Sequence, residues 1–176
     1  MLAPPPFTTV ESKLPALWPL LMTELYAARY HNKCLMSPYT ERYVLYPTPL
    51  RAKFLWEHRH RDFNTLWWRV EVGHLPFKKV VRTWIARRMR QAFRTALYQQ
   101  GFDAQGRPLP AAEIQGKEIP SRRSGIAGTV AITATDKTKK ASDVQIQKEM
   151  NAVVEKLVTV ARKTLPSGTA ASQKLD

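Results

Sequence analysis

The chain has 176 residues, a formal net charge of +14, and a hydrophobic fraction of 44% that includes 10% aromatic residues. This length and hydrophobic content predict one folded domain with a sizeable core, and they exclude a purely disordered basic tail. The single cysteine, Cys34, excludes an internal disulfide and any zinc site built from several cysteines of this chain.

The first residues, 1–9, are rich in proline and are expected to be extended. They lack the positively charged start and apolar core of a secretory signal, and the first arginine is Arg29, which is unlike an organelle presequence. No apolar run approaches the roughly 20 residues that cross a bilayer, so we expect no membrane insertion.

Apolar residues then recur at spacings of four, four and three: Leu17, Leu21, Leu25 and Ala28. This spacing predicts a helix from about Ala16 to Tyr30. Pro15 and Pro19 fit such a helix only in or before its first turn, where their missing N–H groups have no acceptor anyway.

Residues 31–48 have mixed periodicity and carry three tyrosines among nearby cations: Tyr39, Tyr43 and Tyr46, with Lys33, Arg42, Arg51 and Lys53. Aromatic rings between cations can stack on unpaired bases while the cations hold phosphates. Alternatively, these tyrosines line the edge of the core with their hydroxyls in water.

A short helix is expected after Pro49, running through Leu50, Phe54, Leu55 and His58. The segment Thr65 to Val72 alternates Trp68, Val70 and Val72 with Trp67, Arg69 and Glu71. This alternation predicts a strand with one buried face.

Leu75 to Gly101 is predicted to form a long basic helix that Gly101 ends. At 100° per residue, the apolar sector holds Phe77, Val80, Val81, Trp84, Ile85 and Ala92, with Met89 and Ala96 at its rim. The opposite sector holds Lys79, Arg82, Arg87, Arg90 and Arg94. Three residues depart from this separation, because Arg88 projects into the apolar sector while Phe93 and Leu97 lie among the cations.

The rest of the chain predicts a loop over residues 102–124, a strand at Ile126–Thr133 and a basic turn at Asp136–Lys140. A final helix capped by Ser142 or Asp143 follows. Its apolar positions are Ile146, Met150, Val153, Leu157 and Val160. Residues 165–176 are expected to be a disordered tail.

Together these elements predict an α+β fold of three to four helices on a small β-sheet, with extended N- and C-terminal tails. Residues 10–164 form one basic domain that contains the loop at 102–124. If the strands at 65–72 and 126–133 are neighbours, the long helix between them allows a parallel pair.

One short run, WEHRHRDF, holds Glu57, His58, His60 and Asp62, which are residue types used in metal binding and acid–base catalysis. No third metal ligand follows at a recognisable interval, and Arg59 and Arg61 intervene. We therefore predict no catalytic site, no metal and no cofactor, and interpret the run as a phosphate-contacting stretch. Cys34 is expected to be a buried free thiol.

The long helix has no Asp or Glu between Leu75 and Gly101, whereas solvated surface helices usually mix in glutamates. This predicts a polyanion partner, and structured RNA is favoured over duplex DNA because Asn and Gln are scarce on the cationic face. The predicted RNA-binding residues are Lys78, Lys79, Arg82, Arg87, Arg90, Arg94, Arg59, Arg61, Arg122 and Arg123.

The stretch WIARRMRQAFRTALYQQGFDAQGRPL (Trp84 to Leu109), the strand GIAGTVAIT, the C-terminal helix and the tyrosine-rich N-terminal half resemble a fungal-type mitochondrial ribosomal protein. The resemblance implies a noncatalytic constituent of the ribosome in the mitochondrial matrix. Its partners would be rRNA and neighbouring ribosomal proteins, with no small-molecule substrate.

Two alternative functions stay open at this point. One is an RNA-processing enzyme or nuclease that uses His58 and His60. The other is an accessory subunit of a respiratory membrane assembly, in which the cations would face acidic lipid or acidic subunits.

Overall fold

The computed structural model describes residues 17–73, 77–110 and 125–164. In chain order the elements are β1 (Trp18–Met22), β2 (Tyr26–His31), α1 (Pro38–Leu45), α2 (Arg51–Arg59), β3 (Leu66–Val72), α3 (Lys79–Gln99), β4 (Gly128–Ala134), the 3-10 helix η2 (Asp136–Lys139) and α4 (Asp143–Thr164). The predicted α+β class is therefore confirmed. The tails expected at 1–9 and 165–176 lie outside the described residues, as do Arg122 and Arg123.

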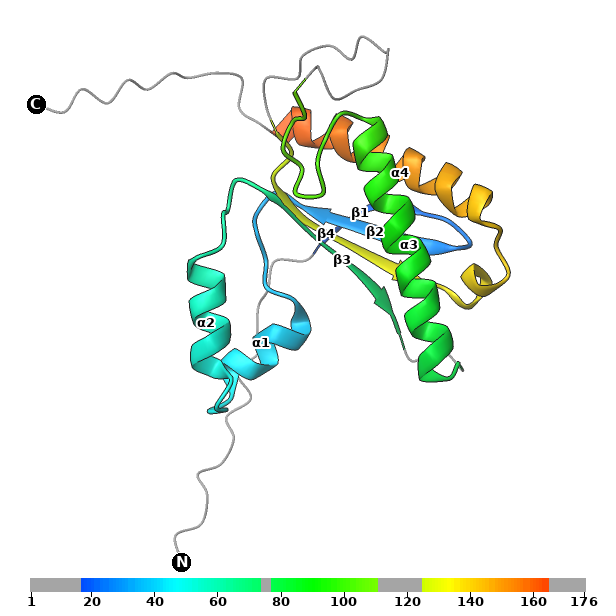
Figure 1. Cartoon of the computed structure of the whole chain (residues 1–176). Helices are drawn as coiled ribbons and strands as arrows, with labels where there is room; N and C mark the ends of the chain where they lie inside the picture. The colour runs from blue at the N-terminus through cyan, green and yellow to red at the C-terminus, as the bar shows by residue number, and fades with distance from the viewer. Residues whose placement is uncertain (1–16, 74–76, 111–124, 165–176) are drawn as a thin grey trace, which may run out of the picture.

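The described strands form one sheet in the order β1-β2-β4-β3 (Figure 1). β1 pairs antiparallel with β2, and β2 pairs antiparallel with β4. β3 and β4 pair parallel, with α3 in the connection between them. This confirms the parallel pair that the sequence allowed for the strands at 65–72 and 126–133.

The helix predicted from Ala16 to Tyr30 is wrong, because this segment forms the β1–β2 hairpin. In β2 every second side chain is buried, at Tyr26, Ala28 and Tyr30. This alternation is the period of a strand, and it occurs in the same segment whose apolar residues also fit the spacing of a helix. Pro19 is tolerated because β1 is an edge strand and the register shifts between Pro19 and Leu21.

The core lies between α3, α4 and one face of the sheet, which we call the inner face (Figure 1). α3 packs against β3 and α4, and α4 also contacts β1. The predicted apolar positions of α4 are confirmed: Ile146, Met150, Val153 and Leu157 are buried, and Val160 is partly buried. The Ser142 hydroxyl accepts the Gln145 N–H at 3.2 Å, so it caps this helix.

The predicted apolar sector of α3 is wrong in part. The buried residues of α3 are Ile85, Ala86, Met89, Ala92, Phe93, Ala96 and Leu97. Val80 and Trp84 are instead 78% and 46% exposed. The buried side of α3 therefore includes Phe93 and Leu97, because α3 packs against β3 and α4 on this side.

Arg88, the cation in the predicted apolar sector, is held at the boundary between α3 and α4. It forms an ion pair of 2.6 Å with Asp143 and donates a hydrogen bond of 2.8 Å to the Ala141 carbonyl. Its guanidinium also stacks on the Trp84 ring, 4.4 Å from the centroid. The charge of Arg88 is therefore compensated within the protein by Asp143.

Gly101 ends α3 as predicted, with a φ of +81°. The Phe102 N–H reaches the Leu97 carbonyl at 3.0 Å and the Gly101 N–H reaches the Tyr98 carbonyl at 2.9 Å, which is the Schellman arrangement. Of the loop expected at 102–124, the part up to residue 110 is described. It is folded back on itself by an isolated bridge between Phe102 and Pro108.

α1 and α2 form an arm on the other side of the sheet, which we call the outer face (Figure 1). The short helix expected after Pro49 is confirmed as α2, whereas α1 was not predicted. The signal for α1 is local, because Ser37 caps the helix, Pro38 opens it and Glu41 lies in its first turn. Neither helix of the arm has a fully buried residue.

Candidate nucleic-acid interface

The exposed side of α3 presents a row of arginines, Arg87, Arg90 and Arg94, which we call the α3 basic row. Their spacing of three and four residues places them on one side of the helix, beside the buried stripe, and the Arg94 guanidinium lies 5.7 Å from the centroid of the Trp68 ring. Lys78 and Lys79 are also exposed at the start of the helix. Within the described residues none of these five cations forms an ion pair, so their charge is not compensated.

Arg82, which was predicted to bind RNA with this row, is placed differently. It is half-buried, and its Nε is buried without a hydrogen-bond partner among the described residues. Arg82 therefore lies apart from Arg87, Arg90 and Arg94, although all four shared one predicted sector.

A shallow apolar groove lies beside the α3 basic row, and the sequence analysis missed it. It is lined by Lys79, Val80, Thr83, Trp84 and Arg87. Val80 and Trp84 had been assigned to the core on their hydropathy, so no sequence signal distinguished them from buried residues. Their exposure places an aromatic ring among the cations, an arrangement that can support base stacking.

Arg59 and Arg61 form a second basic region at the end of α2, away from α3 (Figure 1). The Arg61 guanidinium lies over the Trp67 ring at 4.2 Å from its centroid. Trp67 is only 5% exposed, and its Nε1 donates to the Asp62 carbonyl at 3.0 Å. The exposed RNA-binding residues that were predicted within the described part of the chain are thus divided between two surfaces on opposite sides of the sheet.

The two histidines of WEHRHRDF are each engaged by aromatic rings. His58 meets Phe63 and Trp67 edge-on, with centroid distances of 5.3 Å. Burial lowers the pKa of His58, and the charge of Arg61 lowers it further, so the neutral ring is favoured. His60 instead stacks on Trp56 at 4.3 Å, and its Nδ1 lies 2.8 Å from the Trp56 carbonyl oxygen.

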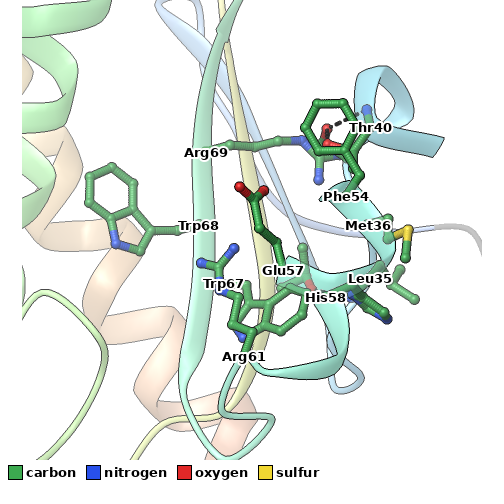
Figure 2. Close-up of a pocket in the computed structure, with 12 residues that line it drawn as sticks. Leu35, Met36, Thr40, Phe54, Glu57, His58, Arg61, Trp67, Trp68 and Arg69 are labelled. Atoms are coloured by element: carbon green, nitrogen blue, oxygen red, sulfur yellow. Dashed lines mark hydrogen bonds between the residues drawn. The ribbon is translucent and has the colours of Figure 1, made fainter. Parts of the chain in front are cut away.

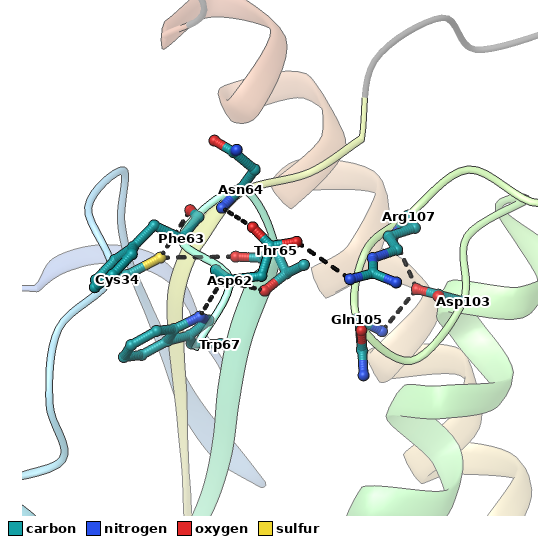
Figure 3. Close-up of polar contacts among 9 residues, drawn as sticks. All are labelled: Cys34, Asp62, Phe63, Asn64, Thr65, Trp67, Asp103, Gln105 and Arg107. Atoms are coloured by element: carbon teal, nitrogen blue, oxygen red, sulfur yellow. Dashed lines mark hydrogen bonds and ion pairs between the residues drawn. The ribbon is translucent and has the colours of Figure 1, made fainter. Parts of the chain in front are cut away.

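Asp62 organises the turn between α2 and β3 (Figure 3). Its backbone carbonyl accepts the Thr65 hydroxyl at 2.7 Å, in addition to the Trp67 indole. Its carboxylate accepts the Asn64 N–H at 2.9 Å and pairs with Arg107 at 3.1 Å. This carboxylate is therefore committed to holding the turn and the 101–110 segment together.

Arg107 itself belongs to a compact turn arranged around Asp103 (Figure 3). The Asp103 carboxylate accepts the backbone N–H groups of Gln105 at 2.7 Å and Arg107 at 2.8 Å. The Gln105 carbonyl in turn accepts the N–H of Leu66, the first residue of β3. The described part of this loop thus secures the start of the strand that contains Trp67.

Cys34 is half-buried, and its thiol contacts the carbonyls of Phe63 at 3.2 Å and Thr65 at 3.7 Å. Burial raises the pKa of the thiol, which keeps it protonated. Across residues 17–73, 77–110 and 125–164, no three His, Cys, Asp or Glu side chains come together in a way that could hold a metal.

The tyrosines of the arm lie on α1 and just after it. Tyr39 and Tyr46 are exposed, and the Tyr39 and Tyr43 hydroxyls lie 2.9 Å apart. Tyr43 also packs against Phe54 of α2, at 5.4 Å between ring centroids. Tyr43 therefore joins the two helices of the arm, and Tyr39 and Tyr46 stay outside the core.

Fold and surface together define an α+β protein with two separate basic surfaces, one on α3 and one at the end of α2. No family model, curated protein or solved structure matches the chain. Among the helices that the structure describes, none has the length and apolar character needed to span a membrane.

Proposed function

We propose that this protein is a structural constituent of the mitochondrial ribosome that binds rRNA phosphates through the α3 basic row and contacts neighbouring ribosomal proteins. The observation that carries the proposal is the exposure of Arg87, Arg90 and Arg94 in a row along a helix whose neighbouring side is buried in the core. The ribosomal particle and the matrix location rest on the resemblance of Trp84 to Leu109, quoted above, to fungal-type mitochondrial ribosomal proteins.

The scaffold suits the binding of a phosphate backbone. From Arg87 to Arg94 the helix advances about 10 Å, and α3 is fixed along this length by Met89, Ala92 and Phe93 in the core. Cations on a fixed helix are already arranged for a partner, so less conformational entropy is lost on binding. Guanidinium groups also form two parallel hydrogen bonds with phosphate, which favours arginine over lysine in such a row.

The test compares two triple variants with the same change in net charge. The first replaces the row, as Arg87→Gln, Arg90→Gln and Arg94→Gln. The matched control replaces exposed cations of α4, as Lys148→Gln, Lys156→Gln and Arg162→Gln. Affinity for a structured RNA is measured by fluorescence anisotropy at several salt concentrations, and co-sedimentation with mitochondrial ribosomal particles is followed on sucrose gradients.

We expect the row variant to bind weakly and to leave the particle at lower salt. The slope of log affinity against log salt should fall by about 2 to 3, because each lost phosphate contact removes about 0.7 to 0.9 from it. The α4 control should stay close to the wild type. Equal losses in both variants, or a wild-type protein that sediments free of the particle, would contradict the proposal.

Anionic lipid vesicles in the same assay address the respiratory alternative. Tight binding of the wild type to vesicles without binding to RNA would favour a membrane-associated subunit.

A further inference from the structure

A cleft of about 230 Å³ lies between the arm and the outer face of the sheet (Figure 2). Its lining includes Phe54, Glu57 and His58 from α2, Arg61 from the following turn, and Trp67 and Arg69 from β3. Figure 2 shows the side chains of Glu57, Arg61 and Arg69 directed into this space, whereas Trp68 points to the other side of β3.

We propose that this cleft binds one unpaired nucleotide of an RNA, with guanine as the preferred base. Glu57 would accept hydrogen bonds from the base, Arg69 would donate to it, and Arg61 would hold the adjoining phosphate. The inference rests on the proposed function, since it assumes an RNA partner, and it assigns a separate role to the second basic region.

The size of the cleft selects a ligand of the scale of one base. Pockets for drug-sized ligands occupy roughly 300 to 1,000 Å³, and this cleft is smaller, at about 230 Å³. A phosphate group alone would leave most of the cleft empty. A planar base fits the walls better, because Phe54 and His58 supply rings beside which it can lie.

Arg61 is held in place before any ligand binds. Its guanidinium stacks on Trp67, whose indole is fixed by the hydrogen bond to the Asp62 carbonyl. Stacking uses the face of the guanidinium and leaves the N–H groups at its edge for an anion. A phosphate next to the bound base would meet these N–H groups without further ordering of the side chain.

Glu57 distinguishes a nucleotide from a purely anionic ligand. Within the described residues its one ion pair is a 3.9 Å contact with the exposed Lys53. An acidic peptide entering the cleft would be repelled by this carboxylate. A ligand that combines negative charge with N–H donors satisfies both Glu57 and Arg61, and a nucleotide has this combination.

The same carboxylate favours guanine among the four bases. Guanine presents two adjacent N–H donors on its Watson–Crick edge, and a carboxylate can accept both through its two oxygens. The other bases offer it one donor beside an acceptor. Arg69 complements this choice. Its Nε binds Glu71, and its Nη groups form no hydrogen bond with another described residue, so they can donate to the O6 and N7 acceptors of guanine.

The experiment uses the full chain and four single-stranded RNA pentamers, UUGUU, UUAUU, UUCUU and UUUUU, with affinity read by fluorescence anisotropy. We expect UUGUU to bind at least about fivefold more tightly than the others. Glu57→Gln should remove this preference, because an amide replaces one acceptor with a donor. The Glu57 side chain is solvent-accessible within the cleft, and the matched control is the exposed Glu155 of α4, whose Glu155→Gln variant should retain the preference.

Failure of this inference and failure of the proposed function give different results. The triple variant of the α3 basic row should weaken binding of structured RNA and leave the ratio between pentamers unchanged. Equal affinity of the wild type for all four pentamers, with structured RNA still bound, overturns the cleft assignment alone. Tighter binding of an Asp- and Glu-rich pentapeptide than of UUGUU also overturns it.

Discussion

The two faces of the sheet differ in how completely they are covered. On the inner face, α3 and α4 enclose a core in which Phe93, Met150 and Leu157 have no exposed surface. On the outer face, the arm of α1 and α2 has no fully buried residue and leaves a cleft. The comparison indicates that the inner face supplies most of the stability and leaves the outer face available for binding.

The adjacent residues Trp67 and Trp68 show how one strand serves both faces. Successive side chains of a strand point to opposite sides. Trp68 packs on Phe93 at 4.9 Å between centroids and donates its Nε1 hydrogen to the Ala104 carbonyl at 2.7 Å. On the outer face, the Trp67 ring stacks against the Arg61 guanidinium. Any disturbance of the register of β3 would therefore affect the core and the cleft together.

The largest effect is expected for Phe93→Ala on the inner face. Removing this fully buried ring should lower the free energy of unfolding by about 3 to 5 kcal/mol, measured by urea denaturation. The control, Val80→Ala, removes an exposed side chain from the same helix and should change stability by less than about 0.5 kcal/mol. A larger loss for Val80→Ala than for Phe93→Ala would mean that α3 presents the stripe expected from hydropathy.

A smaller effect is expected for Tyr26→Phe, also on the inner face. The Tyr26 hydroxyl donates to the Glu149 carbonyl at 2.8 Å, and its loss should cost about 1 to 2 kcal/mol. Burial raises the pKa of Tyr26 above its ordinary value of 10.0, and the negative charge of Glu149 raises it further. The unfolded chain therefore loses this proton first as the pH rises.

The contribution of Tyr26 should accordingly be complete below about pH 10 and decline above it. Urea denaturation of wild type and Tyr26→Phe at pH 9, 10 and 11 checks this, since the other tyrosines are common to both proteins. The difference in stability between the two proteins should shrink with pH. A constant difference would show that the hydroxyl titrates alike in the folded and unfolded states.

The smallest effect on global stability is expected on the outer face. Ser37 caps α1 by accepting the Thr40 N–H at 3.0 Å, and such a cap contributes about 1 kcal/mol to its helix. We expect Ser37→Ala to speed amide hydrogen exchange in α1 and α2 while global unfolding stays nearly unchanged. The matched variant Ser142→Ala removes the cap of α4 and should lower global stability by about 1 kcal/mol. Equal global losses would show that arm and core unfold as one unit.

Much of the fold could be predicted from the sequence where a local pattern is strong. The apolar spacing of α4, the strand at β3 and the glycine stop of α3 each depend on residues close together in the chain, and these predictions are confirmed. The single buried face predicted for β3 is wrong, because Trp67 on the opposite face is buried while Trp68, Val70 and Val72 are partly buried. The β1–β2 hairpin could not be predicted this way. Its apolar residues fit a helical period as well as a strand period, and pairing of β2 with β4 decides between them.

The candidate interface also has features that follow from local sequence and features that follow from tertiary packing. The sequence by itself determined that the protein is an α+β domain with a long helix of uncompensated positive charge, because composition and short-range periodicity depend on neighbouring residues alone. Only the tertiary structure decided that Val80 and Trp84 face outward, that Phe93 and Leu97 face inward, and that Glu57, Arg61 and Arg69 share a cleft. These outcomes depend on packing between segments distant in the chain, which residue spacing does not encode.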